Sequence, residues 1–403
     1  MDILKTLGLR RNDFVARKTV TFGDESAVTA NRLASILSVL SIFLLWGAFT
    51  GSAWSPVHVP APFEGQSQFS YTVTDASGAA STGNVTIDVI PKGAPPPPEP
   101  EPVTSGAVTG DYKYTTTRIG STIPVLRNDA EKGEGLTITA INGQTVEPGD
   151  EVRVPGGSVL LTPRNTFFFK PALGLQTDPI YLPPPENVLA RFVEIWNSGY
   201  RDTTLAGHVG WSLFRVFSGF IAGSLVGIPL GMAMGLNSWV RGAFDPIVEF
   251  MRPVPPLALI PLVIIWAGIG EVAKIILLFL AALWIMAIAA RAGVSGVNIA
   301  KVHAAYSLGA SKWQLLTKVI FPNALPEIFT GARVAMGVCW GTVVAAELVA
   351  AEKGSGMMIM VASKFQLTDI VIMGIIVIGV IGYTIDILMR QIENWLVPWK
   401  GRS

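Results

Sequence analysis

The sequence is poor in the residues that build metal centres and disulfide frameworks. Its 403 residues include one cysteine, Cys339, and three histidines, His58, His208 and His303. A single cysteine excludes an intrachain disulfide and a cysteine-based metal site, and the scattered histidines share no metal-ligand spacing. We therefore expect no bound metal, and we interpret the histidines as ordinary solvent-exposed or interface residues.

Charged residues are also scarce, and neither sign predominates. They make up 15% of the sequence, with a formal net charge of +1, whereas soluble domains have about 25%. Binding of nucleic acid depends on an excess of Lys and Arg that neutralises phosphates, so we expect no nucleic-acid partner. The Gly-x4-Gly-Lys-Ser/Thr loop that cradles nucleotide phosphates does not occur in the sequence.

Apolar residues are abundant instead, at 50% of the sequence, and the mean hydropathy is +0.47. A transmembrane helix needs about 20 predominantly apolar residues. Six segments meet or approach this length: 33–54, 209–236, 254–266, 272–290, 332–350 and 370–389. The third is short and interrupted by prolines. The sequence therefore predicts an α-helical integral membrane protein with six transmembrane helices.

The first span has a second interpretation. Basic residues precede it, and Gly51 and Ala53 could form the small-residue site at which a signal peptide is cleaved. Its apolar run is longer than that of most signal peptides, so we favour a helix that is retained.

Lysine and arginine residues orient the spans, because positively charged loops stay in the cytoplasm. The leader before the first span contains Lys5, Arg10, Arg11, Arg17, Lys18 and Arg32. The short loops on the opposite side contain only Lys274, Lys353 and Lys364. We predict that both termini are cytoplasmic and that the long loop after the first span is periplasmic.

That loop, residues 55–178, has the pattern of a β domain. Apolar residues alternate with polar ones, for example at Phe69–Tyr71–Val73, as is typical of half-buried strands. A stretch with four consecutive prolines, 93–102, predicts a stiff spacer in its middle. We predict an inserted all-β sandwich of immunoglobulin-like size.

The order of the β segments resembles a circularly permuted immunoglobulin-like or cadherin-like bacterial module. Residues 114–143 resemble the beginning of such a module and residues 62–89 its end. The resemblance implies that both pieces share one core and that the two membrane connections leave from neighbouring strands. Related modules can bind calcium, but Lys132 interrupts the acidic residues Asp129, Glu131 and Glu134. We expect no calcium here.

The second span contains glycines at every fourth position: Gly219, Gly223, Gly227, Gly231 and Gly235. This spacing puts them on one helix face, where a neighbouring helix can approach closely. Two roles stay open, helix packing and lining of a substrate path, and we favour packing. Gly337 and Gly341 predict a smaller groove of the same kind in the fifth span.

The proline-rich stretch 252–261 includes Pro255 and Pro256. Each proline removes a backbone donor, and irregular backbone at membrane depth is tolerated where it is buried in protein or lines a cavity. A helix that begins at an elbow near the cytoplasmic surface is an equally good interpretation.

Three ionisable residues, Arg215, Glu347 and Asp386, lie near the ends of predicted spans. Buried charge in a membrane is costly and often functional. We expect all three side chains to reach the interface, and we retain Glu347 as a candidate for the translocation path because it precedes the flexible turn Gly354–Gly356.

The loop between the fourth and fifth spans is the most informative segment. It contains His303-Ala304-Ala305, three further residues, Gly309, and then Val319-Ile-Phe-Pro322. This pattern resembles the EAA loop of binding-protein-dependent ABC importer permeases, with His303 where the family usually has Glu. The resemblance implies that about 303–317 is a cytoplasmic coupling helix that contacts an ATPase. The implied coupling residues are His303, Ala304, Ala305, Gly309, Ser311 and Pro322.

Further motifs resemble the nitrate, taurine, alkanesulfonate and bicarbonate branch of these permeases. They are Leu182–Leu189, Gly227–Gly231, Arg252–Pro261, Trp266–Glu271 and Ala345–Val349. The resemblance implies a type I ABC importer permease fold with three parts. These are a leader and first helix (1–54), the β insertion (55–178) and a permease core (179–403).

The same resemblance implies a bacterial inner-membrane homodimer with a cytoplasmic ABC ATPase dimer and a periplasmic substrate-binding protein. The chain is then no enzyme, because ATP and Mg would bind the partner ATPase. A small oxyanion, taurine or another sulfonate first, would cross by alternating access. The alternative is an ion channel or secondary transporter with a β ectodomain, in which inverted repeats or charges at span centres are expected. The sequence shows neither.

Overall fold

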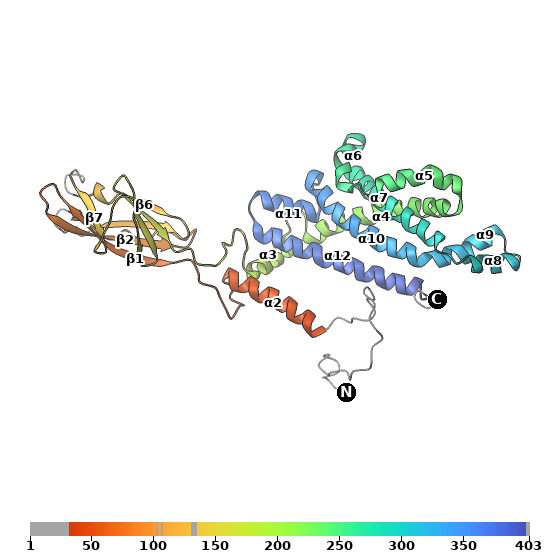
Figure 1. The fold of residues 1–403 in the computed structure, drawn as a ribbon, viewed down its shortest axis with the longest axis horizontal. Coiled ribbons are helices and arrows are strands. Elements are labelled where there is room, and N and C mark those ends of the chain that lie inside the picture. Colours follow the sequence, from red (N-terminus) through yellow and green to blue (C-terminus); the bar gives the residue numbers. More distant parts are fainter. Residues whose placement is uncertain (1–31, 102–103, 106–107, 130–134, 400–403) are drawn as a thin grey trace, which may run out of the picture. The chain divides into compact units, whose positions relative to one another are not determined.

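The computed structural model describes residues 32–101, 104–105, 108–129 and 135–399, and the chain divides into two compact units, Met1–Glu186 and Asn187–Ser403 (Figure 1). Several residues discussed above lie outside the described residues: Lys5, Arg10, Arg11, Arg17, Lys18, Glu131, Lys132 and Glu134. Each unit is described by itself.

The first unit begins with the apolar helix α2 (Arg32–Thr50). Gly51, at φ +68°, ends the helix four residues before the predicted end of the span, because this backbone conformation is outside the helical region. The chain segment that enters the β domain and the segment that leaves it both bond to the C-terminus of α2. The Val59 amide donates to the Ala48 carbonyl at 3.2 Å, and the Thr177 amide donates to the Phe49 carbonyl at 2.8 Å. These bonds satisfy carbonyls that a helix end leaves unpaired.

The β domain is a sandwich of two sheets (Figure 1). The first contains, in spatial order, β5 (Asp111–Thr116), β2 (Ala80–Ile90), β1 (Gly65–Thr74), β7 (Thr137–Ile141) and β8 (Gln144–Thr145). The second contains β6 (Ser121–Ile123), β11 (Phe167–Pro171), β10 (Gly157–Leu161) and β9 (Glu151–Val154). A short ribbon of β3 (Thr104–Ser105) and β4 (Val108–Thr109) and the turn η2 (Val125–Arg127) complete it.

The pieces before and after the proline spacer share one core. Strand β1 pairs antiparallel with β7, with Tyr71 opposite Ile141, and β2 pairs parallel with β5. The rings of Phe69 and Phe167 pack edge to face across the sandwich, with centroids 5.5 Å apart. The expectation that 62–89 and 114–143 complete each other is therefore confirmed. The alternating apolar residues of β1 and β2 are the buried ones, as the period-two pattern predicts.

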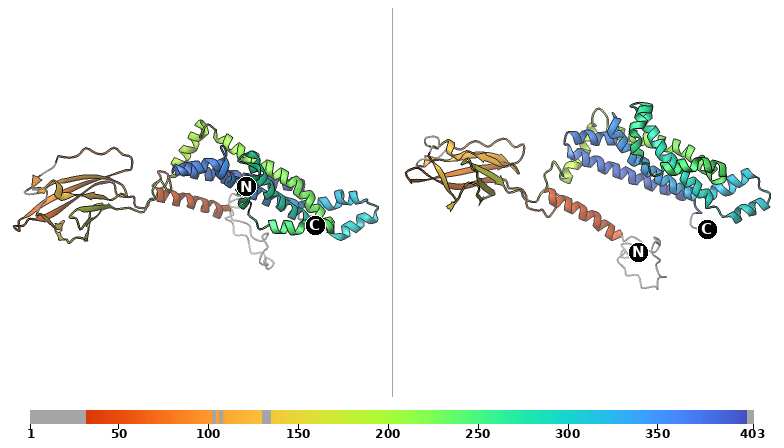
Figure 2. Two further views of the ribbon diagram at one scale, coloured as in Figure 1. Left: turned by 90° about the horizontal axis from the view of Figure 1, so that it is seen from above. Right: turned by 45° about the horizontal axis from the view of Figure 1, so that its top comes forward.

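The second unit is helical. Its elements are α3 (Pro185–Ser198), α4 (Leu205–Leu236), α5 (Ser238–Met251), η4 (Pro256–Leu259), α6 (Ile260–Ala267), α7 (Glu271–Ser295), α8 (Ile299–Ser307), α9 (Lys312–Leu315), the π-helical turn η5 (Leu316–Ile320), α10 (Phe321–Ala350), α11 (Ser355–Lys364) and α12 (Thr368–Leu396). Helices α4, α7 and α10 pack around a common core that includes Leu278, Met286 and Met336, and the long helices lie side by side from both directions in Figure 2. Cys339 is buried in this core.

Five of the described helical segments are long and apolar enough to cross a membrane, and they lie in α2, α4, α7, α9–α10 and α12. The third predicted span, 254–266, corresponds to η4 and α6, and this segment meets helix α5 at 96°. The reason lies in the prolines, since Pro253 and Pro255 cannot donate the amide bonds that would carry α5 onward. Counting this bent pair as one span gives six.

Candidate functional site

The five glycines of α4 form the surface on which α7 lies. A methyl group built at each position would come closer than 3.0 Å to residues of α7. At Gly227 it would meet the Leu283 carbonyl at 2.6 Å, and at Gly235 the Val294 side chain at 2.7 Å. Gly219, Gly223 and Gly231 meet Leu278, Ala282 and Ala287 in the same way. Of the two roles left open by the sequence, the geometry supports helix packing, because α7 covers this face.

Gly337 and Gly341 differ from this pattern. A methyl group at either position would meet nothing within 4 Å. The groove expected in α10 therefore has no occupant among the described residues of this chain.

Arg215 of α4 joins several parts of the helical unit. Its Nε and Nη2 atoms donate to the two carboxylate oxygens of Glu271 on α7 at 2.5 and 2.7 Å. Its Nη1 atom donates to Glu347 on α10 at 2.6 Å and to the Lys353 carbonyl at 2.8 Å. The side chains of Arg215 and Glu347 are 1% and 0% exposed. The guanidinium is thus buried, and four of its five N–H donors have acceptors.

The Glu347 carboxylate is held from two further directions. Its Oε1 atom accepts a bond from the Ser212 hydroxyl at 2.8 Å, and its Oε2 atom accepts one from the Gly356 amide at 2.8 Å. Gly354, at φ +137°, lies so close that any side chain there would collide with the carboxylate. Glycine is required at this turn by its conformation and by the space available.

The expectation that Arg215 and Glu347 reach the membrane interface is wrong. Both are buried and paired, because a charge that finds an opposite charge and hydrogen bonds can stay inside a helix bundle. Glu347 consequently does not border an open path in this conformation. Asp386 differs from these two residues. Its side chain is 36% exposed and pairs with Arg333 and Arg390, so it is not enclosed in the helical unit.

His208 is also not the ordinary surface residue that we expected. It is fully buried, its Nδ1 atom accepts from the Gly354 amide at 3.2 Å, and its Nε2 atom bonds the Tyr200 carbonyl at 2.9 Å. The ring fixes the turn that surrounds Glu347.

Sequence reasoning missed Glu271 and Lys274 as members of this network. Lys274, with a side chain 5% exposed, donates to Glu271 at 2.9 Å. Lys274 lies in the first turn of α7, not in a short periplasmic loop as expected from the sequence. A usable signal was the presence of opposite charges at the ends of two predicted spans, Arg215 in the second and Glu271 directly before the fourth.

The expected coupling segment forms two short helices, α8 and α9, on either side of Gly309. Helix α8 carries His303, Ala304 and Ala305 and ends at Ser307, and Gly309, at φ +82°, follows its C-terminus. The Gly309 amide bonds the Tyr306 carbonyl and the Ala310 amide bonds the Ala305 carbonyl, the pattern of a Schellman cap.

The next helix begins with a capping box. The Ser311 hydroxyl accepts from the Gln314 amide, and the Gln314 side chain accepts from the Ser311 amide. Pro322 lies in the first turn of α10, where its missing donor does no harm. Two strong helix boundaries therefore fix the bend at Gly309.

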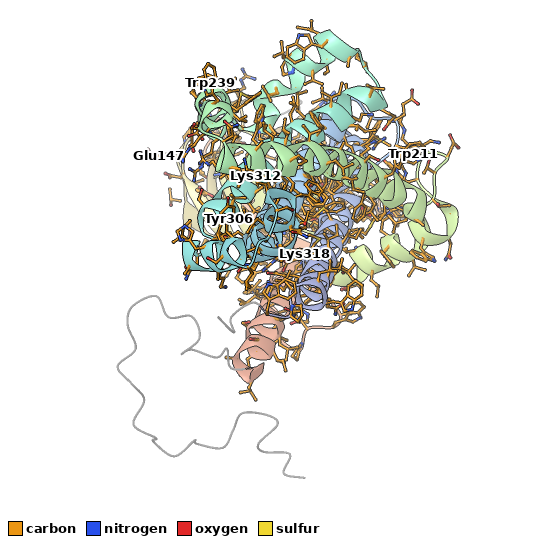
Figure 3. The ribbon with its side chains drawn as sticks, turned by 90° about the vertical axis from the view of Figure 1, so that its right-hand side faces the viewer. Glu147, Trp211, Trp239, Tyr306, Lys312 and Lys318 are labelled. Carbon is orange, nitrogen blue, oxygen red and sulfur yellow. The ribbon has the colours of Figure 1, made fainter. Side chains whose placement is uncertain are left out.

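The surface of these two helices and of the turn between them carries three large apolar side chains among polar ones. Tyr306, Leu308 and Trp313 are 67%, 89% and 70% exposed. Figure 3 shows Tyr306 and Lys312 at the end of the helical unit that faces the viewer. Large exposed apolar side chains grouped on one surface are typical of a protein interaction site.

The proline pair lies at the bend of the α5–α6 segment. Pro255 precedes η4 in an extended conformation, and Pro256 is its first residue. In the conformation seen here Pro255 is exposed and Pro256 is half-buried. Among the described residues no group of three or more His, Cys, Asp or Glu side chains could hold a metal ion.

Comparison with known proteins identifies the family. Residues 223–397 match the family described as "Binding-protein-dependent transport system inner membrane component". The taurine transport system permease protein TauC of Escherichia coli is 48% identical over 224 residues, 55% of this chain and 82% of that protein.

Two further relatives are similar over the same length. A putative aliphatic sulfonates transport permease protein, SsuC of Bacillus subtilis, is 37% identical over 55% of this chain and 78% of its own length. The nitrate import permease protein NrtB of Synechocystis is 32% identical over 54% and 81%. The chain therefore belongs to the inner membrane components of binding-protein-dependent transport systems, the permease subunits of ABC importers, and has their type I fold.

Proposed function

We propose that this chain translocates a small oxyanion across the inner membrane, with taurine or another organosulfonate as the first candidate. The observation that carries the proposal is the 48% identity to a taurine transport permease across the helical unit. The similarity to sulfonate and nitrate permeases supports the wider class of small oxyanions. The channel and secondary-transporter alternative has no comparable support.

We infer that the α8–α9 surface docks on a separate ABC ATPase, which binds ATP and Mg. The exposed side chains of Tyr306, Leu308 and Trp313 support a docking role, since a monomeric surface rarely groups such residues. His303, Ala304 and Ala305 lie on α8, and Ser311 and Pro322 position the helices that follow it. Closure of the ATPase would then displace the helices through a rigid, well-capped segment.

We propose that a second copy of the chain packs on the open face of α10. Val334, Gly337 and Gly341 follow each other at helical spacing on this face, Val334 is 55% exposed, and the two glycines have free space in front of them. Small residues allow close approach of helices in lipid. These features support a homodimer that encloses the translocation path between two copies.

The proposed topology places both termini in the cytoplasm and the β domain in the periplasm, where a substrate-binding protein would deliver the oxyanion. The distribution of Lys and Arg supports it. The β domain then has an accessory role near that delivery step. The bend between α5 and η4–α6 provides an element that can move between outward-facing and inward-facing states. The binding protein and the ATPase would shift the populations of these two states by binding one of them more tightly.

Uptake by cells that depend on this chain tests the proposal. The chain is expressed with the ATPase and binding protein of its own operon in a host without sulfonate uptake, and labelled taurine, ethanesulfonate, nitrate and bicarbonate are compared. We expect ATP-dependent uptake of at least one of these anions, with a sulfonate preferred. A matched control carries an ATPase variant unable to hydrolyse ATP. Equal uptake in the control would point to a channel and contradict the proposal.

A further inference from the structure

The exposed large apolar side chains that follow α2 in the first unit gather at one end of the β sandwich. They belong to the two segments that connect the sandwich with α2 and α3, and to the turn between β5 and β6. Each is between 55% and 77% exposed, and together they form an apolar collar: Trp54, Val57, Ile119, Leu173, Leu175 and Tyr181. Among the described residues of the sandwich, Tyr114 on β5 is the exposed large apolar side chain outside this set.

The opposite end of the sandwich, toward which β1 runs, has a different surface. Its described turns are Asp75-Ala-Ser-Gly-Ala79 between β1 and β2, Glu147-Pro-Gly-Asp150 before β9, and Thr162-Pro-Arg-Asn-Thr166 between β10 and β11. They consist of proline and of small or polar residues. A single exposed leucine needs no explanation, but a group confined to one end of a domain indicates a surface that is covered in the assembled protein.

The collar is fixed to the last turn of α2. The incoming and outgoing segments both bond to that turn, and the Leu175 amide joins them to each other by donating to the Pro60 carbonyl at 2.7 Å. The Gln176 carbonyl accepts a bond from the Arg118 side chain, which holds the turn that contains Ile119 against the outgoing segment. The end of the sandwich and the end of the helix therefore form one connected structure.

The first two collar residues are held in the same way. The Ser52 hydroxyl, two residues after α2, donates to Glu186 at 2.6 Å and accepts a bond from the Trp54 amide at 3.2 Å. The Ser55 hydroxyl donates to the Val57 carbonyl at 2.7 Å. Their exposure thus occurs in a hydrogen-bonded turn and not in a free chain end.

The length of α2 determines the depth of the collar in the membrane. The helix has 19 residues, which at about 1.5 Å per residue span about 28 Å, close to the thickness of about 30 Å of the hydrocarbon core. It begins at Arg32, and its apolar side chains between Ile36 and Leu45 are exposed. The C-terminus of α2 therefore lies where the hydrocarbon ends and the headgroup layer begins. Tryptophan and tyrosine are enriched in this layer.

We propose that the apolar collar lies in the interfacial layer of the lipid bilayer, in the leaflet at the C-terminal end of α2. Lipid is the partner, because the collar continues the exposed apolar surface of a membrane-spanning helix and contains both Trp54 and Tyr181. The β sandwich then stands at a fixed height on the membrane, and its polar end faces the aqueous compartment. This inference concerns the β domain and holds whichever substrate crosses the membrane.

The depth of spin labels in lipid nanodiscs tests the proposal. The full-length Cys339→Ala protein is assembled with phosphatidylethanolamine and phosphatidylglycerol, and single labels are attached at Val57→Cys and Leu175→Cys. Ala76→Cys is the matched control, because Ala76 is exposed in the turn at the polar end. Relaxation of each label by oxygen, which concentrates in lipid, is compared with relaxation by a water-soluble nickel chelate. We expect the ratio of oxygen to chelate relaxation to be severalfold higher at both collar positions than at the control.

Two results would overturn the proposal. Equal ratios at all three positions would show that the collar lies in water. Labels at Val57→Cys and Leu175→Cys that are shielded from both reagents would show that protein covers the collar instead of lipid. If a collar variant does not assemble, Ile119→Cys replaces it, since Ile119 lies in a separate turn of the collar and is exposed.

Discussion

Arg215 and Glu347, 132 residues apart in the chain, form a 2.6 Å ion pair that ties α4 to α10 inside the helical unit. Neither side chain reaches solvent. Each charge is therefore tolerated because the other is present, and the pair acts as one structural element rather than as two surface charges. Its mutational behaviour should differ from that of exposed ion pairs in the same protein.

Glu347→Ala should lower the stability of the protein by about 3–5 kcal/mol, because it leaves a buried guanidinium short of an acceptor. Thermal unfolding is measured in detergent as the fraction of the protein that remains monodisperse after heating. Glu151→Gln is the control. Glu151 pairs with Lys170 at 3.2 Å with both side chains 45% exposed, and such pairs contribute about 1 kcal/mol or less. Equal losses in the two variants would contradict the assigned role of Glu347.

Gly227→Leu should prevent assembly of the helical unit. The new side chain would occupy space filled by the Leu283 carbonyl and Met286, and separating α4 from α7 would expose the packed core of both. Gly210→Leu is the matched control on the same helix, since a methyl group there meets nothing within 4 Å. The amount of folded protein after detergent extraction checks the pair. Normal yield of Gly227→Leu would refute the packing role.

Gly309→Val should abolish ATP-coupled transport while the protein still inserts into the membrane. Valine is strained at φ +82°, at a cost of about 1–2 kcal/mol, and the bend between α8 and α9 would shift. Gly309→Asn is the control, because asparagine tolerates the left-handed conformation better than other residues with side chains. Transport rate and stimulated ATPase activity are measured together. If Gly309→Val couples ATP hydrolysis to transport as the wild type does, the α8–α9 segment has no role in coupling.

The parts of the protein that local pattern determines were predictable. Apolar length located α2, α4, α7, α10 and α12, and period-two alternation located β1 and β2. The predicted ends of the spans were less accurate where charged residues near those ends form ion pairs. The last span was expected to end at Met389, but α12 continues to Leu396, and its Arg390 bonds Asp386 at 2.7 Å. A charge that ends an apolar run does not end a helix when it has a partner one turn away.

The full ionic network was not predicted, because it depends on which helices become neighbours. Arg215, Glu271 and Glu347 come from three helices, and nothing in the separation of 56 or 132 residues indicates contact. The bend at α5–α6 was visible as a run of prolines, but whether the segment crosses the membrane depends on the surrounding helices. The bend between α8 and α9 was predictable, since Gly309 was expected to separate two helical pieces and has the left-handed conformation that ends the first of them.

Cysteines introduced at Ser81 and Ser403 should differ in accessibility to an impermeant thiol reagent in intact cells. The proposed topology predicts labelling at Ser81, in strand β2, and protection at Ser403 until the membrane is opened. The native Cys339 is buried and gives little background. Labelling of Ser403→Cys but not Ser81→Cys in intact cells would reverse the topology.

The β domain should fold when residues 55–178 are produced alone. Its core consists of residues of this segment, among them Tyr71, Ile87, Val159 and Phe169, all fully buried. Circular dichroism and a cooperative thermal transition are the measurements. An unfolded fragment would show that the core depends on the rest of the chain, and the next experiment would then be done on the full protein.

The stability of the β domain should fall as the pH rises, because of Asp111. Burial raises the pKa of this carboxyl to about 7, and the charge of Asp129 adds to the shift, against the opposing bond from the Tyr71 hydroxyl at 3.0 Å. The folded domain therefore holds a proton that the unfolded chain releases near pH 4. Between about pH 4 and pH 7 the folded state binds more protons than the unfolded chain, so the free energy of unfolding falls with rising pH and stays reduced above pH 7.

Asp111→Asn removes the titration and keeps an acceptor for Tyr71, so its Tm at pH 8 should exceed that of the wild type by several degrees, with little difference at pH 4. Glu64→Gln, at an exposed position, should follow the wild type at both values. Parallel pH profiles for Asp111→Asn and wild type would show that Asp111 is charged in the folded domain.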